Sequence, residues 1–184
     1  MGEFRVQLLG GLRLIFNGAP LTTFKTPRLQ ALLAFLVLHP GMPQFRYQIA
    51  YTFWPESSEA QSRTNLRNLI HQLRQALPNC DQFISFKTQT LRWRENAPYT
   101  LDVREFESLL ALKPGLPPSR DVFDQAVRLY QGDLLPSCYD DWIIAERERL
   151  RSAFLAALES LAEIAESSRD YPAALEYTRR LSRY

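Results

Sequence analysis

The segment from Glu59 to Leu77 constrains the fold most, because its apolar residues recur every three or four positions, the spacing of one helix face. Those residues are Leu66, Leu69, Ile70, Leu73 and Leu77. They predict a helix that packs one side against a core. No acidic residue follows Glu59 in this segment, so the rest of the helix is expected to carry cations without carboxylate partners.

The cationic edge beside the apolar stripe holds Arg63, Arg67, His71 and Arg74. Arginine binds guanine edges and phosphates, and amide side chains bind adenine, so this edge predicts a nucleic-acid contact. An ordinary solvated amphipathic helix is the alternative. His71 is equally well explained as a solvated side chain.

Charge is divided unevenly along the 184 residues, although the net charge is only +2. Residues 1–97 hold 11 Lys/Arg and 5 Asp/Glu, giving +6, whereas residues 98–184 hold 11 and 15, giving −4. A basic first half suits a polyanion, and a mildly acidic second half suits protein contacts or solubility.

Cysteine and hydropathy patterns narrow the class of protein further. Cys80 and Cys138 are isolated and lack zinc-site spacing, so we expect neither a metal site nor a disulfide, and a reducing cytoplasmic location. No apolar run approaches the ~20 residues of a membrane span, so no membrane partner is expected.

The first half shows the element order of a winged helix. Strands are expected at 4–9, 12–16 and 21–24, then helices at 28–38, capped by Thr26-Pro27, and at 44–52. Ser57-Ser58 opens the basic helix, and a hairpin of strands 82–86 and 90–94 follows. This order would place the third helix in the major groove and the hairpin on the flanking backbone.

Cations elsewhere in this half are candidates for phosphate contacts. Lys87, Arg92 and Arg94 lie on the hairpin, where simple solubilising charge is the alternative. Lys25 and Arg28 flank the start of the first helix, where free backbone N–H groups favour an anion. Ordinary surface charge is the alternative there too.

Beyond Pro98 only helices are expected, at about 103–112, 120–131, 140–167 and 171–183, with the third open to interruption. Pro114, Pro117 and Pro118 mark the first connection. The alternating charges from Glu146 to Arg151 predict a solvated, ion-paired face. The last helix reaches Tyr184 without a capping residue, so we expect the chain to stop within a longer protein or just short of a partner helix.

Catalytic motifs do not occur in the sequence. It contains no GxxxxGK[ST] loop, GxSxG elbow or HExxH pair, and its two histidines lie apart. We therefore expect no catalytic residue and no cofactor.

Several sequence motifs together resemble those of one known family. They are FRVQLLGGLRLIFNG, KTPRLQALLAFLVLHPG, YTFWPE and LRNLIHQLRQAL in the first half, and AVRLYQGDLL, DDWIIAERERLR and RDYPAALEYTRRL in the second. The chain resembles bacterial transcriptional activators of the AfsR/SARP type, in which an OmpR-like winged helix precedes a bacterial transcriptional activation domain. The resemblance implies an α+β winged helix over residues 1–97 and an all-α, tetratricopeptide-like domain over residues 98–184.

The resemblance also implies a function and a set of partners. The protein would bind double-stranded promoter DNA, often at direct repeats, and help to recruit RNA polymerase; a homodimer on DNA is compatible with this role. The recognition-helix role falls on Arg63, Thr64, Arg67, Asn68, His71 and Arg74. The alternative is a helical protein-interaction module whose winged helix docks a protein rather than DNA.

Two departures from the family pattern concern aromatic residues. Trp93 and Arg94 stand where many relatives have a glycine-tyrosine pair, which leaves the wing contact open. The second helix is rich in aromatic residues, which we expect to be core because a helix beneath a recognition helix needs apolar bulk. They are Phe45, Tyr47, Tyr51, Phe53 and Trp54.

Overall fold

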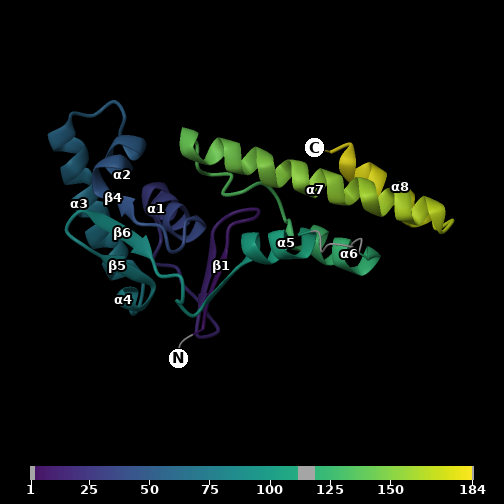
Figure 1. Ribbon diagram of the computed structural model, residues 1–184, viewed down its shortest axis with the longest axis horizontal. Helices are drawn as coiled ribbons and strands as arrows, with labels where there is room; N and C mark the ends of the chain where they lie inside the picture. Colours follow the sequence, from purple (N-terminus) through teal and green to yellow (C-terminus); the bar gives the residue numbers. More distant parts are fainter. Residues whose placement is uncertain (1–2, 112–118, 184) are drawn as a thin grey trace. The chain divides into compact units, whose positions relative to one another are not determined.

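The computed structural model describes residues 3–111 and 119–183 (Figure 1). The chain forms two compact units. Within the described residues, the first comprises 3–5 and 13–99, and the second comprises 6–12 and 100–183. The second unit therefore takes in a short segment from near the start of the chain. The predicted division at residue 97 places that segment in the first domain instead.

A four-stranded sheet has the strand order β3-β2-β1-β7. Its strands are β1 (Phe4–Gln7), β2 (Arg13–Phe16), β3 (Ala19–Pro20) and β7 (Tyr99–Leu101). Asn17 and Gly18 adopt positive φ angles of 51° and 78°, which gives a two-residue hairpin turn between β2 and β3. Because the turn is that short, pairing begins at Ala19, and the prediction of a third strand at 21–24 was wrong.

Three helices follow in the first unit (Figure 1): α1 (Pro27–Leu38), α2 (Arg46–Phe53) and α3 (Glu59–Ala76). Thr26 caps α1 by accepting from the N–H of Leu29, and Ser58 caps α3 by accepting from the N–H of Gln61. Both predicted helix starts are confirmed. Helix α2 begins two residues later than predicted, because β4 (Gln44–Phe45) first pairs with the hairpin.

The hairpin consists of β5 (Ile84–Phe86) and β6 (Thr90–Trp93), and its sheet has the order β4-β6-β5. A short helix, α4 (Cys80–Phe83), occupies part of the first predicted strand. Asn79 takes a left-handed conformation with φ 53°, and its carbonyl accepts from the N–H of Gln82, so the chain turns helical before it extends.

Aromatic rings form much of the core of the first unit. The centroid of Phe83 lies 5.1 Å from that of Phe4 and 5.8 Å from that of Trp93, which also meets Tyr99 at 5.1 Å. Trp93 is fully buried. It is therefore a core residue beneath the hairpin and not a wing contact.

The second unit contains helices α5 (Asp102–Leu110), α6 (Arg120–Leu129), α7 (Asp141–Ser167) and α8 (Tyr171–Leu181). The predicted helices agree within a few residues, and α7 is uninterrupted. The expectation of no strand after Pro98 was wrong, because Tyr99–Leu101 forms β7 before α5. The predicted proline-marked connection at 114–118 lies outside the described residues.

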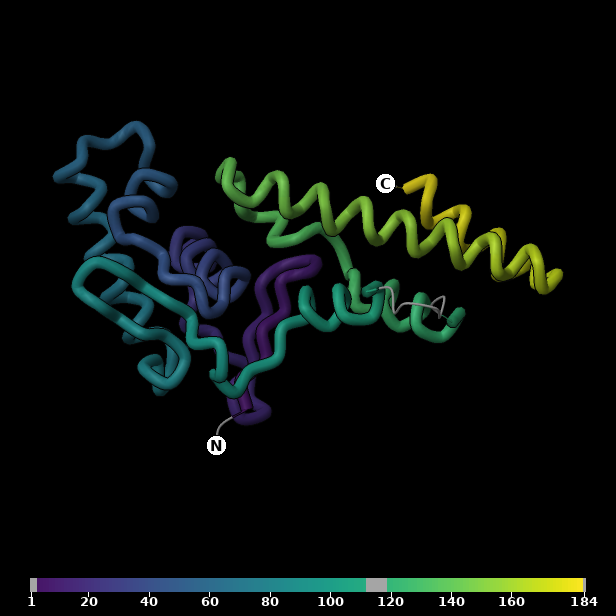
Figure 2. The backbone as a smooth tube through the Cα atoms, viewed as in Figure 1, coloured from purple at the N-terminus to yellow at the C-terminus, as the bar shows by residue number. Residues whose placement is uncertain are grey.

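Helix α8 packs along α7, and α6 packs against α7 (Figure 2). Tyr130 at the end of α6 stacks on Phe154 of α7 with ring centroids 4.2 Å apart. Arg120 and Asp170 form an ion pair at 2.9 Å, and the hydroxyl of Tyr177 donates to Asp124 at 2.8 Å. The array thus combines a packed aromatic centre with polar links between α6 and the last helix.

The buried carboxylate of Asp102 attaches the segment Val6–Leu12 to the helical array. It accepts from the N–H groups of Leu8 at 2.8 Å and Leu9 at 2.9 Å, and from its neighbour Val103 at 2.8 Å. Burial raises the pKa of Asp102, while these three N–H donors oppose the shift. Asp102 is thus a structural link that no sequence pattern indicated.

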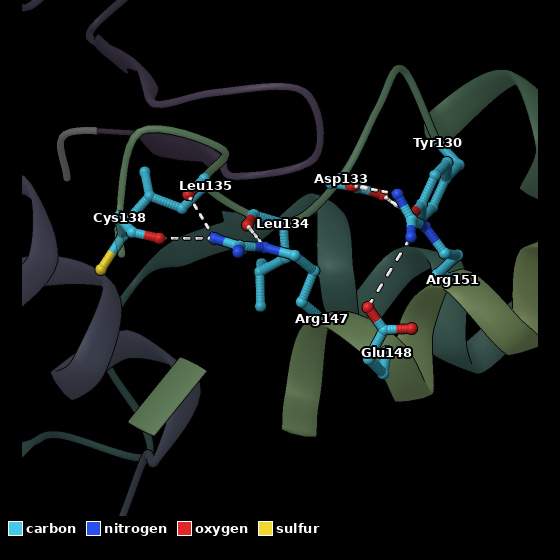
Figure 3. Close-up of polar contacts among 8 residues, drawn as sticks. All are labelled: Tyr130, Asp133, Leu134, Leu135, Cys138, Arg147, Glu148 and Arg151. Carbon is cyan, nitrogen blue, oxygen red and sulfur yellow. Dashed lines mark hydrogen bonds and ion pairs between the residues drawn. The ribbon is translucent and has the colours of Figure 1, made fainter. Parts of the chain in front are cut away.

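Arg147 organises the connection between α6 and α7 (Figure 3). Its Nε donates to the carbonyl of Leu134 at 2.9 Å, and one terminal nitrogen donates to those of Leu135 at 2.9 Å and Cys138 at 2.7 Å. The ion-paired face predicted around it is present: Arg151 pairs with Asp133 at 2.7 Å, and Arg149 pairs with Glu146 at 2.6 Å and with Glu107. Arg147 is the exception, because it binds backbone carbonyls.

Candidate nucleic-acid interface

Helix α3 has the two faces that its sequence predicts. Leu66, Leu69, Ile70 and Leu73 are buried in the first unit. The opposite side is exposed and carries Arg63, Thr64, Arg67, Asn68, His71 and Arg74. At about 100° per residue, these six positions cover one continuous arc of the helix surface. We call this arc the α3 face.

Arg63 is not an unpaired cation. Its guanidinium lies 2.5 Å from the carboxylate of Glu59, one turn earlier on the exposed surface. The expectation of arginines without a carboxylate partner is wrong for this residue, because Glu59 at the helix start is within i,i+4 reach.

The middle of the α3 face is open. Among the described residues, the side chains of Arg67, Asn68 and His71 make no hydrogen bond or ion pair. Thr64 donates its hydroxyl hydrogen to the carbonyl of Ala60 at 3.0 Å, which leaves its oxygen as an acceptor. Donors and acceptors for an outside partner are therefore concentrated on the central turns.

Arg74 lies near the end of the helix and is held by the hairpin. Its guanidinium carbon is 4.1 Å from the ring centroid of Phe86, a cation–π contact between α3 and β5. The contact orients Arg74 without neutralising its charge.

The three hairpin cations occupy different positions. Lys87 is exposed in the turn, which is closed by its N–H donating to the carbonyl of Thr90 at 2.9 Å. Arg92 is half-buried on β6, between the buried Leu91 and Trp93. Arg94 follows the strand, and its Nε donates to the carbonyl of Asp81 at 3.0 Å, so its guanidinium is partly engaged by its own unit.

Arg46 is a cation that the sequence reasoning overlooked. It is the first residue of α2, and its N–H donates to the carbonyl of Gln89 in the hairpin turn at 2.9 Å. Burial, and then the charges of Arg74 and Arg67, lower its pKa. The one local signal was a basic residue within RYQIAYTF, a segment interpreted only for its aromatic residues.

A groove of about 500 Å³ lies between the start of α2, the α3 face and the hairpin turn. Its walls include Arg46, Arg63, Arg67, Tyr47, Thr88 and Gln89. We call it the α2–wing groove. It brings together two predicted residues, Arg63 and Arg67, with residues that had no assigned role.

Lys25 and Arg28 are not among the residues that line this groove. Lys25 is exposed just before the cap of α1. The guanidinium carbon of Arg28 lies 5.9 Å from the ring centroid of Phe53 and 5.8 Å from that of Trp54, so this arginine packs over aromatic rings. The structure thus separates these two cations from the groove.

The aromatic residues around α2 are only partly core, contrary to expectation. Phe53 is fully buried, but Phe45, Tyr47 and Tyr51 are 42%, 59% and 73% exposed. Phe45 and Tyr47 line one groove with residues of α3, and Tyr47 and Tyr51 line a second groove with residues of α1 and α3. Packing beneath α3 therefore uses Ile49, Ala50 and Phe53.

The described part of the chain holds no group of three or more His, Cys, Asp or Glu side chains placed to bind a metal ion. Within the same residues, no helix is both long enough and apolar enough to cross a membrane.

Comparison with solved structures finds a protein of similar fold. A structure of Mycobacterium tuberculosis EmbR in complex with a low-affinity phosphopeptide superposes with a TM-score of 0.77 at 18% sequence identity. The match covers 99% of this chain and 50% of that one, so the chain spans half the length of EmbR. No match is found among curated protein sequences.

Residues 101–183 match the family described as the bacterial transcriptional activator domain. The chain thus resembles transcriptional regulators of the AfsR/SARP type. The resemblance inferred from the sequence motifs is confirmed. The predicted fold class, a winged helix followed by a helical domain, is confirmed too. In this fold, α3 is the third helix of the winged helix, and β5 and β6 form its wing.

Proposed function

We propose that this regulator is a sequence-specific activator that binds duplex DNA through the α3 face. The observation that carries the proposal is the open centre of that face, where Arg67, Asn68 and His71 have no partner among the described residues. Arginine and asparagine are the side chains that pair bidentately with guanine and adenine in the major groove.

Backbone contacts would come from the cations around this face. Lys87 at the wing turn and Arg74 at the end of α3 are exposed and flank the central residues. Arg92, Arg94, Lys25 and Arg28 are further candidates, with the last two at the start of α1. Phosphate contacts fix orientation, and the central α3 residues would read the bases.

The helical unit would act on the transcription machinery. A bacterial transcriptional activator domain joined to a DNA-binding unit supports a role in recruiting RNA polymerase at promoters. Binding at direct repeats and a homodimer on DNA belong to the same proposal, as does a cytoplasmic location, where promoter DNA is found.

A selection from random-sequence duplexes tests DNA recognition directly. We expect recovery of one preferred sequence, with the repeat spacing visible in the same data. Affinity for it should fall steeply with salt, because phosphate contacts release counterions. Recovery of no preferred sequence, together with salt-independent binding, would contradict the proposal.

A second candidate function is docking of a protein by the winged helix. It is favoured by the exposed Tyr47 and Tyr51, which line a groove of about 720 Å³ together with Trp54 and Pro55. Tyrosine is enriched in protein interfaces. Tyr51→Ala separates the two functions, because it should weaken a protein partner while leaving duplex affinity unchanged.

A further inference from the structure

The α2–wing groove is lined by cationic side chains and by no carboxylate. Arg46, Arg63 and Arg67 line it, and none of its lining residues is acidic. Glu59 neutralises Arg63 from outside the groove. Arg46 and Arg67 remain without an acidic partner among the described residues, so the groove repels cations and favours an anion.

Arg46 is held in place by its backbone. The strand before it pairs Phe45 with Thr90, and the N–H of Arg46 donates to Gln89 at 2.9 Å. The side chain thus starts from a fixed point where α2 meets the wing. Such fixation lowers the entropy cost of ordering an arginine around a ligand.

The Nε–H of Arg46 is buried and has no hydrogen-bond acceptor in the described part of the chain. A buried donor without an acceptor is costly, and a guanidinium donates best to carboxylate or phosphate oxygens. The burial and nearby arginines that lower the pKa of Arg46 also make its charge unfavourable until an anion arrives. Both observations indicate a missing anionic partner.

We infer that the α2–wing groove seats one phosphodiester of the DNA backbone, with Arg46 as its principal ligand. The inference rests on the proposed DNA binding and names a residue and a contact beyond the predicted set. Thr88 and Gln89 supply polar groups on the wing side, and Arg67 lies on the α3 side. One phosphate would therefore bridge the recognition helix and the wing.

The test compares the wild type with Arg46→Gln on the duplex recovered by selection, or on random-sequence duplex if no preference emerges. Loss of one phosphate contact should reduce the slope of log affinity against log salt by about 0.9. For lines that meet at 1 M salt, this means about eightfold weaker binding at 0.1 M. Because a phosphate carries no sequence information, the loss should be the same for every duplex.

Arg13→Gln is the matched control, since it removes an exposed positive charge from β2, outside the groove. A melting temperature of Arg46→Gln near that of the wild type shows that the unit still folds. Arg46→Lys, which keeps the charge but loses the planar fork, should retain the slope and recover only part of the affinity.

A duplex carrying one neutral methylphosphonate at successive positions then locates the contact. One position should weaken the wild type, and that penalty should vanish in Arg46→Gln. If the wild type binds duplex with a steep salt slope and Arg46→Gln keeps the same slope and penalties, the groove inference is overturned while DNA binding stands. If the wild type binds no duplex, both fail.

Discussion

At the scale of single residues, the two arginines on adjacent turns of α3 have different surroundings. Arg63 is neutralised by Glu59, whereas Arg67 faces solvent with no partner among the described residues. The spacing of the sequence placed both on the cationic edge of the helix. The difference arises because Glu59 lies one turn before Arg63 and two turns before Arg67, so only the first pair is within reach.

Arg67→Ala should weaken binding to the selected duplex by about 1–3 kcal/mol, or roughly 5- to 150-fold, if it pairs with a base. The melting temperature should hardly change, because an exposed substitution shifts stability by about 0.5 kcal/mol or less. Gln72→Ala is the control, as Gln72 is exposed on the same helix but outside the α3 face. Equal losses in the two variants, measured by titration, would argue against base readout by Arg67.

Cys80 should be unreactive in the folded protein. Burial, assisted by the charge of Asp81, raises the pKa of its thiol to about 12, and only the thiolate is nucleophilic. In a Cys138→Ser background, labelling by a disulfide reagent at pH 8 should be slow, and should become fast in denaturant. Rapid labelling of the native protein would show that the thiol is accessible and ionised.

The raised pKa of the Cys80 thiol also predicts how the free energy of unfolding changes with pH. The unfolded thiol ionises at about pH 8.5, whereas the folded one keeps its proton to a higher pH. The contribution of Cys80 is therefore complete below pH 8.5 and is lost as pH rises toward 12. Cys80→Ser should remove this part of the alkaline decline in the free energy of unfolding.

At the scale of elements, features that depend on neighbouring residues were predicted well. Features that depend on residues far apart in the sequence were not. The caps at Thr26 and Ser58 and the turn at Asn17-Gly18 depend on neighbouring residues, so the sequence showed them directly. The pairing of β4 with β6 depends on residues more than forty positions apart, and a two-residue strand has no periodicity to read. Arg46 was missed for the same reason, since its place beside the wing follows from that pairing.

Arg147 provides a test at this scale, because it joins α7 to the preceding connection through three carbonyls. Arg147→Lys should lower the free energy of unfolding by about 1–3 kcal/mol, since an ammonium cannot reproduce the planar fork and leaves carbonyls unsatisfied. Urea unfolding measures the loss. Arg149→Lys is the control, because exposed ion pairs contribute only about 0–1 kcal/mol; similar losses would contradict the role assigned to Arg147.

At the scale of the whole molecule, chain order and structural units do not coincide. The helical unit includes Val6–Leu12, which lies ninety or more residues before Asp102 in the chain. Besides the Asp102 contacts, the N–H of Leu135 donates to the carbonyl of Leu8, and that of Gly10 to Asp133, at 2.9 and 3.0 Å. No local sequence pattern predicts that residues 6–12 belong to the helical unit. A domain boundary placed near residue 97 from composition therefore could not include them.

A fragment of residues 98–184 should accordingly be unstable on its own. It would lack Val6 and Leu8, both fully buried, and each such side chain contributes about 1.5–3 kcal/mol. Together with the lost hydrogen bonds, this is a large part of the 5–15 kcal/mol that stabilises a typical domain. Circular dichroism during heating should show no cooperative transition for the fragment and a clear one for the full chain; a fragment as stable as the full chain would support the boundary at residue 97.

Asp102 receives the segment Val6–Leu12, and this has a consequence for synthesis on the ribosome. Leu8 emerges 94 residues before Asp102, which at roughly 5–20 residues per second is an interval of about 5–20 s. During that time the N–H groups of Leu8 and Leu9 lack the carboxylate that accepts from them, while the residues of the first unit are being synthesised. The first unit would thus be synthesised almost completely before the segment Val6–Leu12 gains its hydrogen bonds to the helical unit.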